Sequence, residues 1–237
     1  MRTKLAQVPI PSIGLQSARI AATLLTMNAY KNAGSISIYL SMPSGEAVTN
    51  DIVKDALTQH KAVFVPFIDN AVSRNGGSLI KAMKMDMVSL ASIDDFERTE
   101  ENRDRWGIPS VAPESVQGRA KVLRVGASTA HDSSGGIAIT AEFERSAEAT
   151  LDVVVMPGMA FDRNCGRLGH GKGYYDTFLE DYRDSKVGAS EKAHFGLALC
   201  EQVLHEDETV PTNQDDWALD ALVVGDGSII ERKPNIF

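Results

Sequence analysis

Short runs of apolar residues alternate with helical periodicities along most of this chain. The run LDVVVMPG (151–158) contains four consecutive apolar residues, the pattern of a strand buried on both faces of a sheet. Comparable strand-like runs occupy five further ranges: 35–41, 61–68, 84–90, 194–200 and 219–225. Helical patterns separate several of these runs, at 15–30, from Asn50 onward as the helix N-cap, and at 174–182. Because strands joined through helices pair in parallel, the sequence predicts the α/β class, with a largely parallel sheet flanked by helices.

The same patterns predict the domain organisation. We expect a single domain over 1–237, with an N-terminal extension at 1–14 and a long loop insertion at 112–149, in which 136–143 adds a possible strand. The charged stretch 94–113 is predicted to be a surface connection. The buried face of the first helix is expected to carry the residues that recur at spacings of three and four: Leu15, Ala18, Ala21, Ala22, Leu25 and Ala29.

Composition excludes several classes of partner. The net charge of −8 argues against nonspecific binding to nucleic acid or to an anionic membrane, and no run of about 18 apolar residues is present to span one. Cys165 and Cys200 lack the spacing of a zinc or redox motif, which favours a reducing compartment. The first acidic residue is Glu46, and an acid-poor N-terminus is also typical of transit peptides. We therefore expect a cytoplasmic protein, with a mitochondrial location as the alternative.

The stretch GRLGHGKGYYD (166–176) carries the clearest chemical signal. It satisfies the G-x-x-x-x-G-K half of a P-loop, but Gly173 stands where a P-loop has the hydroxyl that holds magnesium. Glycines before a helix still favour an anion site, because backbone N–H groups can approach a phosphate closely. A plain glycine-rich turn is the alternative. Asp176, in the first turn of the next helix, is either a metal ligand or a residue that complements the helix dipole.

Three segments together resemble one enzyme family. DVVVMPGMAFDRNCGRLGHGKGYYDTFL (152–179), ISIYLSMPSGEAVTNDIVKDAL (36–57) and VPTNQDDWALDALVV (210–224) are similar to the 5-formyltetrahydrofolate cyclo-ligases. The resemblance implies an ATP- and Mg²⁺-dependent enzyme that turns 5-formyltetrahydrofolate into 5,10-methenyltetrahydrofolate and releases ADP and phosphate. It also implies two binding partners, ATP as co-substrate and the folate with or without a polyglutamate tail. We expect the protein to be a monomer.

The resemblance also implies site residues, position by position. The ATP-binding residues would be Arg167, Leu168, Gly169, His170, Gly171, Lys172, Gly173, Tyr174 and Tyr175, with Lys172 as the catalytic residue. The folate-binding residues would be Leu40, Glu46, Trp106, His170 and Tyr174. The magnesium ligands would be Asp176 and Asp216.

Three departures from the family pattern stand out, one of them the length of residues 112–149, which exceeds the usual connection. Many members have arginine at the position of His170, so this contact to phosphate is expected to be weaker or to depend on pH. Members usually begin with a longer helix whose basic residues reach the ATP phosphates, whereas here only Arg2 and Lys4 precede the first long helix. Two alternatives remain: a catalytically weak relative that binds folate or nucleotide, and a different ATP-dependent phosphotransferase, which leaves the match at Leu40 and Glu46 unexplained.

Overall fold

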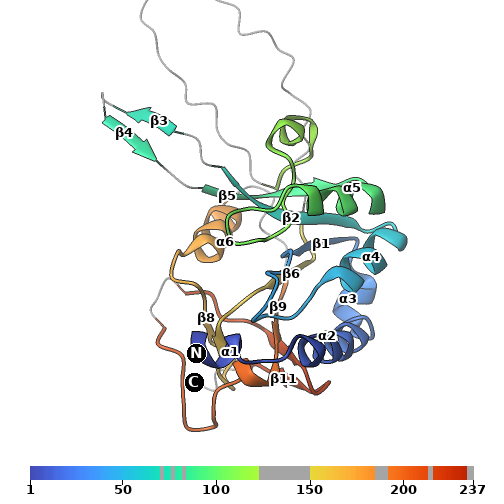
Figure 1. The fold of residues 1–237 in the computed structure, drawn as a ribbon, viewed down its shortest axis with the longest axis vertical. Coiled ribbons are helices and arrows are strands. Elements are labelled where there is room, and N and C mark those ends of the chain that lie inside the picture. Colours follow the sequence, from blue (N-terminus) through green and yellow to red (C-terminus); the bar gives the residue numbers. More distant parts are fainter. Residues whose placement is uncertain are drawn as a thin grey trace, which may run out of the picture.

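A seven-stranded sheet forms the centre of the fold (Figure 1). The computed structural model describes residues 1–69, 72–75, 78–81, 84–122, 150–184, 192–212 and 216–233. The strands of the sheet are β1 (Ser35–Ile38), β2 (Ala62–Asp69), β5 (Lys84–Leu90), β6 (Val153–Met156), β9 (Ala193–Ala198), β10 (Ala221–Val224) and β11 (Ile229–Glu231). Their order is β11-β10-β9-β6-β1-β2-β5, and only the edge strands β11 and β5 run antiparallel to their neighbours. The α/β class with a largely parallel sheet is therefore confirmed.

Helices cover both faces of the sheet, which explains the consecutive apolar residues of its strands. Within β6, Val153 and Val155 pack under α2, α3, α4 and α5, whereas Val154 and Met156 pack under α6. None of the described helices is long and apolar enough to cross a bilayer. The helices are α1 (Arg2–Ala6), α2 (Ile10–Leu24), α3 (Asn28–Asn32), α4 (Asn50–Thr58), α5 (Ile93–Arg98) and α6 (Tyr174–Asp184), with 3₁₀ helices η1 (Thr99–Glu101), η2 (Pro113–Gly118) and η3 (Cys200–Gln202). Two small hairpins complete the fold: β3 (Val72–Asn75) with β4 (Ser78–Lys81), and β7 (Ala160–Phe161) with β8 (Arg167–Leu168).

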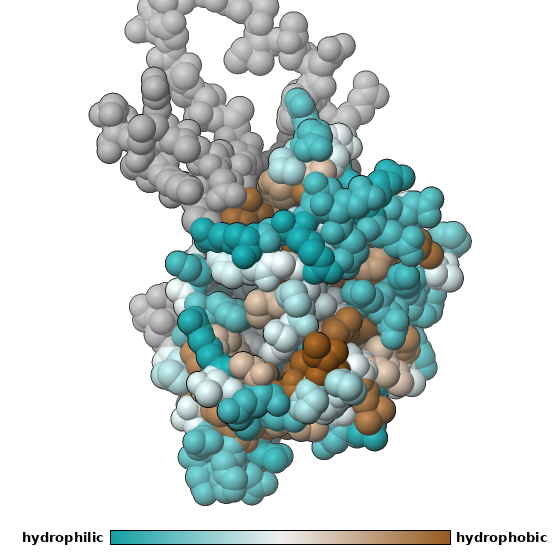
Figure 2. All heavy atoms as spheres, viewed as in Figure 1, coloured by the Kyte–Doolittle hydropathy of each residue, from teal (hydrophilic) through white to brown (hydrophobic). Residues whose placement is uncertain are grey.

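The N-terminal helix differs from the expectation. It begins at Ile10, with Pro9 as N-cap and a proline in its first turn. It ends at Leu24, and the separate short helix α3 begins at Asn28. Of the expected buried face only Ala21 is buried, and Leu15 is 56% exposed. The buried residues of α2 are instead Ile13, Gln16, Ser17, Ile20, Ala21 and Leu24. Because apolar residues of α2 such as Ile10 and Leu15 are exposed, hydrophobic (brown) residues gather in the lower part of the face seen in Figure 2, where Figure 1 places α2.

Two other local predictions need correction. The expected cap Asn50 is the first residue of α4, and Thr49 is the N-cap. The range 94–113 is more than a surface connection, because it contains α5 and η1 and buries Phe96 and Val111. Of the expected insertion 112–149, the structure describes 112–122 and 150 onward, so the possible strand at 136–143 lies outside the described residues.

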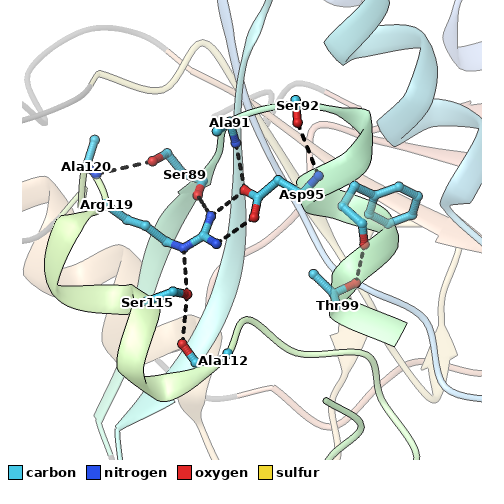
Figure 3. Close-up of polar contacts among 10 residues, drawn as sticks. Ser89, Ala91, Ser92, Asp95, Thr99, Ala112, Ser115, Arg119 and Ala120 are labelled. Carbon is cyan, nitrogen blue, oxygen red and sulfur yellow. Dashed lines mark hydrogen bonds and ion pairs between the residues drawn. The ribbon is translucent and has the colours of Figure 1, made fainter. Parts of the chain in front are cut away.

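A nearly buried ion pair anchors the chain beyond η2 to the edge of the sheet (Figure 3). The guanidinium of Arg119 donates two hydrogen bonds to the carboxylate of Asp95 in α5, at 2.5 and 2.7 Å, and a third to the carbonyl of Ser89 in β5, at 2.7 Å. The following residues pair with the outer side of β5, where Val122 N–H donates to the carbonyl of Met87. The ion pair therefore holds residues 120–122 along the outer edge of β5, so that this edge strand is covered.

The order of the strands creates a switch point between β1 and β6. From β1 the chain proceeds to β2 on one side, and from β6 it proceeds through β9 to β10 on the other side. The segments that follow β1 and β6 therefore diverge above the same edge of the sheet. In open α/β sheets such a crevice is the usual position of a ligand.

Candidate active site

The segment between β6 and α6 forms the small hairpin and then a glycine loop. The hairpin turn closes on Asp162, whose buried carboxylate accepts hydrogen bonds from the backbone N–H groups of Asn164, Gly166 and Val210 at 2.8–2.9 Å. A Cβ at Gly166 would lie 2.6 Å from Asp162 Oδ2, so this position has no room for a side chain. Asp162 is absent from the predicted site residues, although an aspartate that bonds N–H groups two and four residues later is a recognisable turn signal.

The glycine loop, residues 169–173, is exposed except at half-buried Gly169 and leads directly into α6. Gly171 and Gly173 have φ angles of +78° and +65°, in the left-handed region that favours glycine. The first helical hydrogen bond of α6 runs from Thr177 N–H to the Gly173 carbonyl, so the backbone N–H groups of the first helical turn lie next to the loop. Because the hairpin separates this loop from β6, it is not a P-loop, in which the glycines follow the strand directly.

The helix α1 lies beside the glycine loop. Lys172 and His170 are largely exposed on the loop. Partial desolvation by the surrounding chain and, to a smaller extent, the charge of Arg2 lower the pKa of His170. On its other side, α1 contacts the loop after β1, since a Cβ at Gly45 would lie 3.6 Å from Leu5 Cβ. The N-terminal segment therefore connects the loops that follow β1 and β6.

Arg167 and Asp176 form an ion pair at the base of the loop. Arg167 Nη2 donates to Asp176 Oδ1 at 2.8 Å, and the arginine side chain is only 6% exposed. Its guanidinium also lies over the ring of Tyr175, 5.6 Å from the centroid. Arg167 is thus near the predicted phosphate position but already holds a carboxylate. Among the other predicted residues here, Leu168 is partly exposed, Tyr174 is half-buried, and Tyr175 packs against the core under α6.

The two predicted magnesium ligands approach each other through Trp217. The backbone N–H of Trp217 donates to Asp176 Oδ1 at 3.3 Å, and Asp216 is the preceding, exposed residue. In the part of the chain that the structure describes, no three His, Cys, Asp or Glu side chains are grouped as a metal site. Two carboxylates are nevertheless the donors that Mg²⁺ uses when waters and substrate phosphates complete its coordination.

Glu46 is buried in the loop that follows β1. It is 4% exposed, its Oε1 accepts a hydrogen bond from Met42 N–H at 2.5 Å, and burial raises its pKa to about 7. The charge of Glu46 in turn raises the pKa values of Tyr39 and Tyr175, for which burial is the larger cause. Glu46, in the loop after β1, is therefore within electrostatic range of Tyr175 in α6. Leu40, at the start of the same loop, is also buried.

Trp106 lies in an ordered turn beside the Glu46 loop. Its ring is 45% exposed and stacks under the guanidinium of Arg105, 3.9 Å away. The carboxylate of Asp104 accepts hydrogen bonds from the N–H groups of Trp106 and Ile108 at 2.8 and 2.9 Å, which fixes the turn. At the next residue, Gly107, a Cβ would lie 3.0 Å from Pro43 of the β1 loop. The tryptophan is therefore a surface residue bordering the predicted folate position, not a core aromatic.

Two cavities lie at opposite edges of the sheet, and each is lined by one of the predicted site residues. One, of about 880 Å³, lies beyond the ends of β9 and β10, and its lining includes Leu168, Lys4 and Arg163. The other, of about 1030 Å³, is at the opposite edge of the sheet, between Asp152 and Asp220, and includes Asp216. Asp216 therefore lies where the C-terminal segment passes from the glycine-loop side to the opposite edge.

The family model that matches this chain covers residues 1–136 and 108–225, and its description is the 5-formyltetrahydrofolate cyclo-ligase family. The chain belongs to the 5-formyltetrahydrofolate cyclo-ligase family. The cyclo-ligase of Saccharomyces cerevisiae is 28% identical over 223 residues, which are 92% of this chain and 88% of the yeast protein. A mitochondrial cyclo-ligase of Arabidopsis thaliana is 27% identical over 224 residues, 90% of this chain and 67% of that protein. The expected family and enzyme class, a ligase of folate one-carbon metabolism, are confirmed.

The fold agrees with a solved structure. The NMR structure of 5,10-methenyltetrahydrofolate synthetase from Aquifex aeolicus matches with a TM-score of 0.59 at 17% identity, over 100% of this chain and 90% of that one. In this cyclo-ligase fold the described residues bring together Glu46, Tyr175, Arg167 and Asp176, which lie up to 130 positions apart in the chain.

Proposed function

We propose that the protein converts 5-formyltetrahydrofolate into 5,10-methenyltetrahydrofolate, with consumption of ATP in the presence of Mg²⁺ and release of ADP and phosphate. One observation carries this proposal. Buried Glu46, from the loop after β1, is within electrostatic range of Tyr175, and the ring of Tyr175 lies under Arg167. This supports the proposal, because a reaction between the two ligands requires the proposed folate and phosphate residues to face the same crevice at the switch point.

The chemistry explains why two ligands must meet. The oxygen of a formamide is a poor leaving group, so ring closure is slow until that oxygen is phosphorylated by ATP. N10 of the folate then attacks the activated carbon, and phosphate leaves as the methenyl bridge forms. The protein contributes mainly by holding the reacting atoms together and by neutralising charge on the phosphates.

On the folate side, Glu46 is the proposed acceptor for N–H groups of the pterin ring. A buried carboxylate whose Oε1 accepts one hydrogen bond from its own loop, at Met42 N–H, has acceptor capacity left for a ligand. Leu40 supplies apolar contact, and Trp106 supplies an exposed ring at the border of the loop. His170 and Tyr174 border the folate from the glycine loop.

On the phosphate side, the glycine loop and the first turn of α6 supply backbone N–H groups, and Lys172 supplies the charge nearest the transferred phosphate. The proximity of Arg2 to His170 supports a contribution of the N-terminal helix to this charge.

Asp176 and Asp216 are the proposed ligands of magnesium. When bound, the ion would neutralise phosphate charge during transfer. Two carboxylates on neighbouring segments fit an ion that completes its coordination with substrate phosphates. They do not form a cage that would hold the ion by protein ligands alone.

We also propose that the protein acts as a monomer in the cytoplasm. Leu5 and Val8 are buried against the remainder of the fold, so residues 1–8 contribute to its core. The mitochondrial relative from Arabidopsis keeps organelle import as the alternative.

Absorbance of the methenyl product tests the activity directly. Incubation of the protein with 5-formyltetrahydrofolate and Mg-ATP should give an absorbance rise that requires all three components. Binding of both ligands without an absorbance rise would instead identify a relative that has lost turnover. Hydrolysis of ATP without folate consumption would favour a different phosphotransferase.

A further inference from the structure

Asp176 is shared between two donors in this structure. Its Oδ1 accepts a hydrogen bond from Arg167 Nη2 at 2.8 Å and another from the backbone N–H of Trp217 at 3.3 Å. The carboxylate proposed to bind magnesium therefore already neutralises a cation of the protein. A metal ion arriving at Asp176 would meet the positive charge of this guanidinium at short range.

Arg167 depends on that carboxylate. Its side chain is 6% exposed, Asp176 is its acidic partner, and its only other hydrogen bond in the described residues is a long one, 3.5 Å, from Nη1 to the Pro157 carbonyl. Its Nε is buried and has no hydrogen-bond partner among the residues described. If a metal took over Asp176, the guanidinium would be left nearly buried without a counter-charge, which is strongly unfavourable.

We propose that Arg167 makes binding of the metal dependent on the nucleotide. In the free protein Arg167 holds Asp176, and when Mg-ATP enters, the carboxylate turns to the metal while the guanidinium turns to phosphate oxygens. This exchange leaves both charges paired, whereas binding of the metal alone leaves the arginine unpaired. The inference rests on the proposed function, and adds that metal and nucleotide bind as one unit.

Linkage makes the proposal quantitative. If the nucleotide supplies the new partner of Arg167, it must raise the affinity for the metal, and the metal must raise the affinity for the nucleotide by the same factor. Removing the arginine charge should have opposite effects on the affinity for the metal alone and on the increase in that affinity when nucleotide is added. The metal alone should bind more tightly, because Asp176 is released, and the gain from adding nucleotide should shrink.

Titration with Mn²⁺, monitored by electron paramagnetic resonance, measures the affinity for the metal with and without nucleotide and does not require turnover. For the wild type we expect weak binding of Mn²⁺ alone and much tighter binding with ADP present. For Arg167→Gln we expect Mn²⁺ alone to bind about tenfold more tightly than to the wild type, within the range usual for coupled sites. Arg167→Lys, which keeps the charge, should behave more like the wild type.

Arg98→Gln is the control, because it removes one positive charge from an exposed arginine of α5, on the opposite face of the sheet from α6. It should leave the affinity for Mn²⁺ unchanged. Equal or weaker binding of Mn²⁺ alone by folded Arg167→Gln would overturn the inference, even if the wild type makes the methenyl product. If the glutamine variant does not fold, Mn²⁺ binding by the wild type that is unaffected by ADP overturns it instead. Failure of the proposed function differs, since the wild type would then give no methenyl absorbance.

Discussion

His170 of the glycine loop has a pKa below its ordinary value, because burial disfavours the imidazolium and because the charged Arg2 of α1 lies close to it. Two segments that are far apart in the sequence, the glycine loop and α1, therefore lie within electrostatic range of each other. A neutral imidazole would leave the proposed phosphate site one positive charge short at neutral pH.

Replacing His170 by arginine should strengthen ATP binding at alkaline pH. In the wild type the KM for ATP should fall as pH decreases below about 6.5, the ordinary pKa of histidine, because the lowered pKa of His170 places its protonation in that range, and protonation adds a charged donor to the proposed phosphate site. His170→Arg should have a KM about tenfold lower at the alkaline end, the effect of one charge-assisted hydrogen bond of roughly 1.5 kcal/mol, and should flatten the profile. His170→Gln is the control, and its KM for ATP should be high and should not change with pH. A profile in the arginine variant as steep as that of the wild type would assign the pH dependence to another group.

Lys172→Ala should lower turnover far more than it weakens folate binding. The charge of Lys172 matters most while the phosphate is being transferred, so its loss should reduce kcat by about 10²–10³, as for other groups that stabilise a transition state. Steady-state kinetics with both substrates measures the two effects separately. Lys54→Ala, which removes an exposed lysine paired with Glu97, is the control and should be nearly neutral. An unchanged kcat in the Lys172 variant would exclude the assigned role.

Asp216→Asn should raise the magnesium concentration needed for half-maximal activity. Because Asp216 is exposed, the substitution should not disturb folding, and the requirement should rise about tenfold or more, as losses around metal sites commonly do. A magnesium titration of initial rates measures the shift. Asp207→Asn removes the same charge from a fully exposed position and should have the titration of the wild type. Identical curves for Asp216→Asn would remove this residue from the metal site.

Glu46→Gln should stabilise the folded protein at alkaline pH while it weakens folate binding. Burial raises the pKa of Glu46 from 4.5 to about 7, so between these values the folded state binds more protons than the unfolded state. The free energy of unfolding therefore falls as pH rises through this window, by roughly 3 kcal/mol at 1.36 kcal/mol per pKa unit. The variant should lack this loss, so its advantage over the wild type should be largest above about pH 7 and vanish below pH 4.5. Denaturant unfolding at several pH values measures these free energies. Parallel profiles of unfolding free energy against pH for the two proteins would contradict the assignment.

Arg119→Ala should destabilise the fold without touching the site. The substitution leaves the carboxylate of Asp95 nearly buried without its partner, which costs about 3 kcal/mol for a pair of this kind. Arg119 lowers the pKa of Asp95, so in the wild type this contribution is lost as pH falls through that lowered pKa. Denaturant unfolding measures the change in free energy. Arg103→Ala, in an exposed pair with Glu100, should cost less than about 1 kcal/mol. Equal effects of the two substitutions would show that burial of the Asp95 pair contributes little.

The strands and the glycine loop could be predicted from sequence because their signals are local. β6 is buried on both faces, so it needs consecutive apolar residues, and Gly171 and Gly173 adopt backbone angles that other residues rarely adopt. The face of α2 was wrongly predicted for the opposite reason. Its buried Gln16 is satisfied by Cys200 N–H and by Glu201, and Ser17 accepts from Val48 N–H, so polar residues lie where the apolar pattern excludes them. Those partners are far away in sequence, and no local periodicity reveals them.

By itself, the sequence determined the α/β class, the family and most of the candidate residues, because each depends on a contiguous motif whose residue types are specific. Only the tertiary structure decided the burial, the charge pairing and the pKa values of those residues. Glu46 reads as a loop carboxylate, but the packing of its loop near Tyr175 buries it and raises its pKa to about 7. Arg167 and Asp176 read as separate ligands for phosphate and metal, but the hairpin and α6 place them 2.8 Å apart as an ion pair. Burial and charge pairing arise from contacts between distant segments, so they are properties of the folded chain.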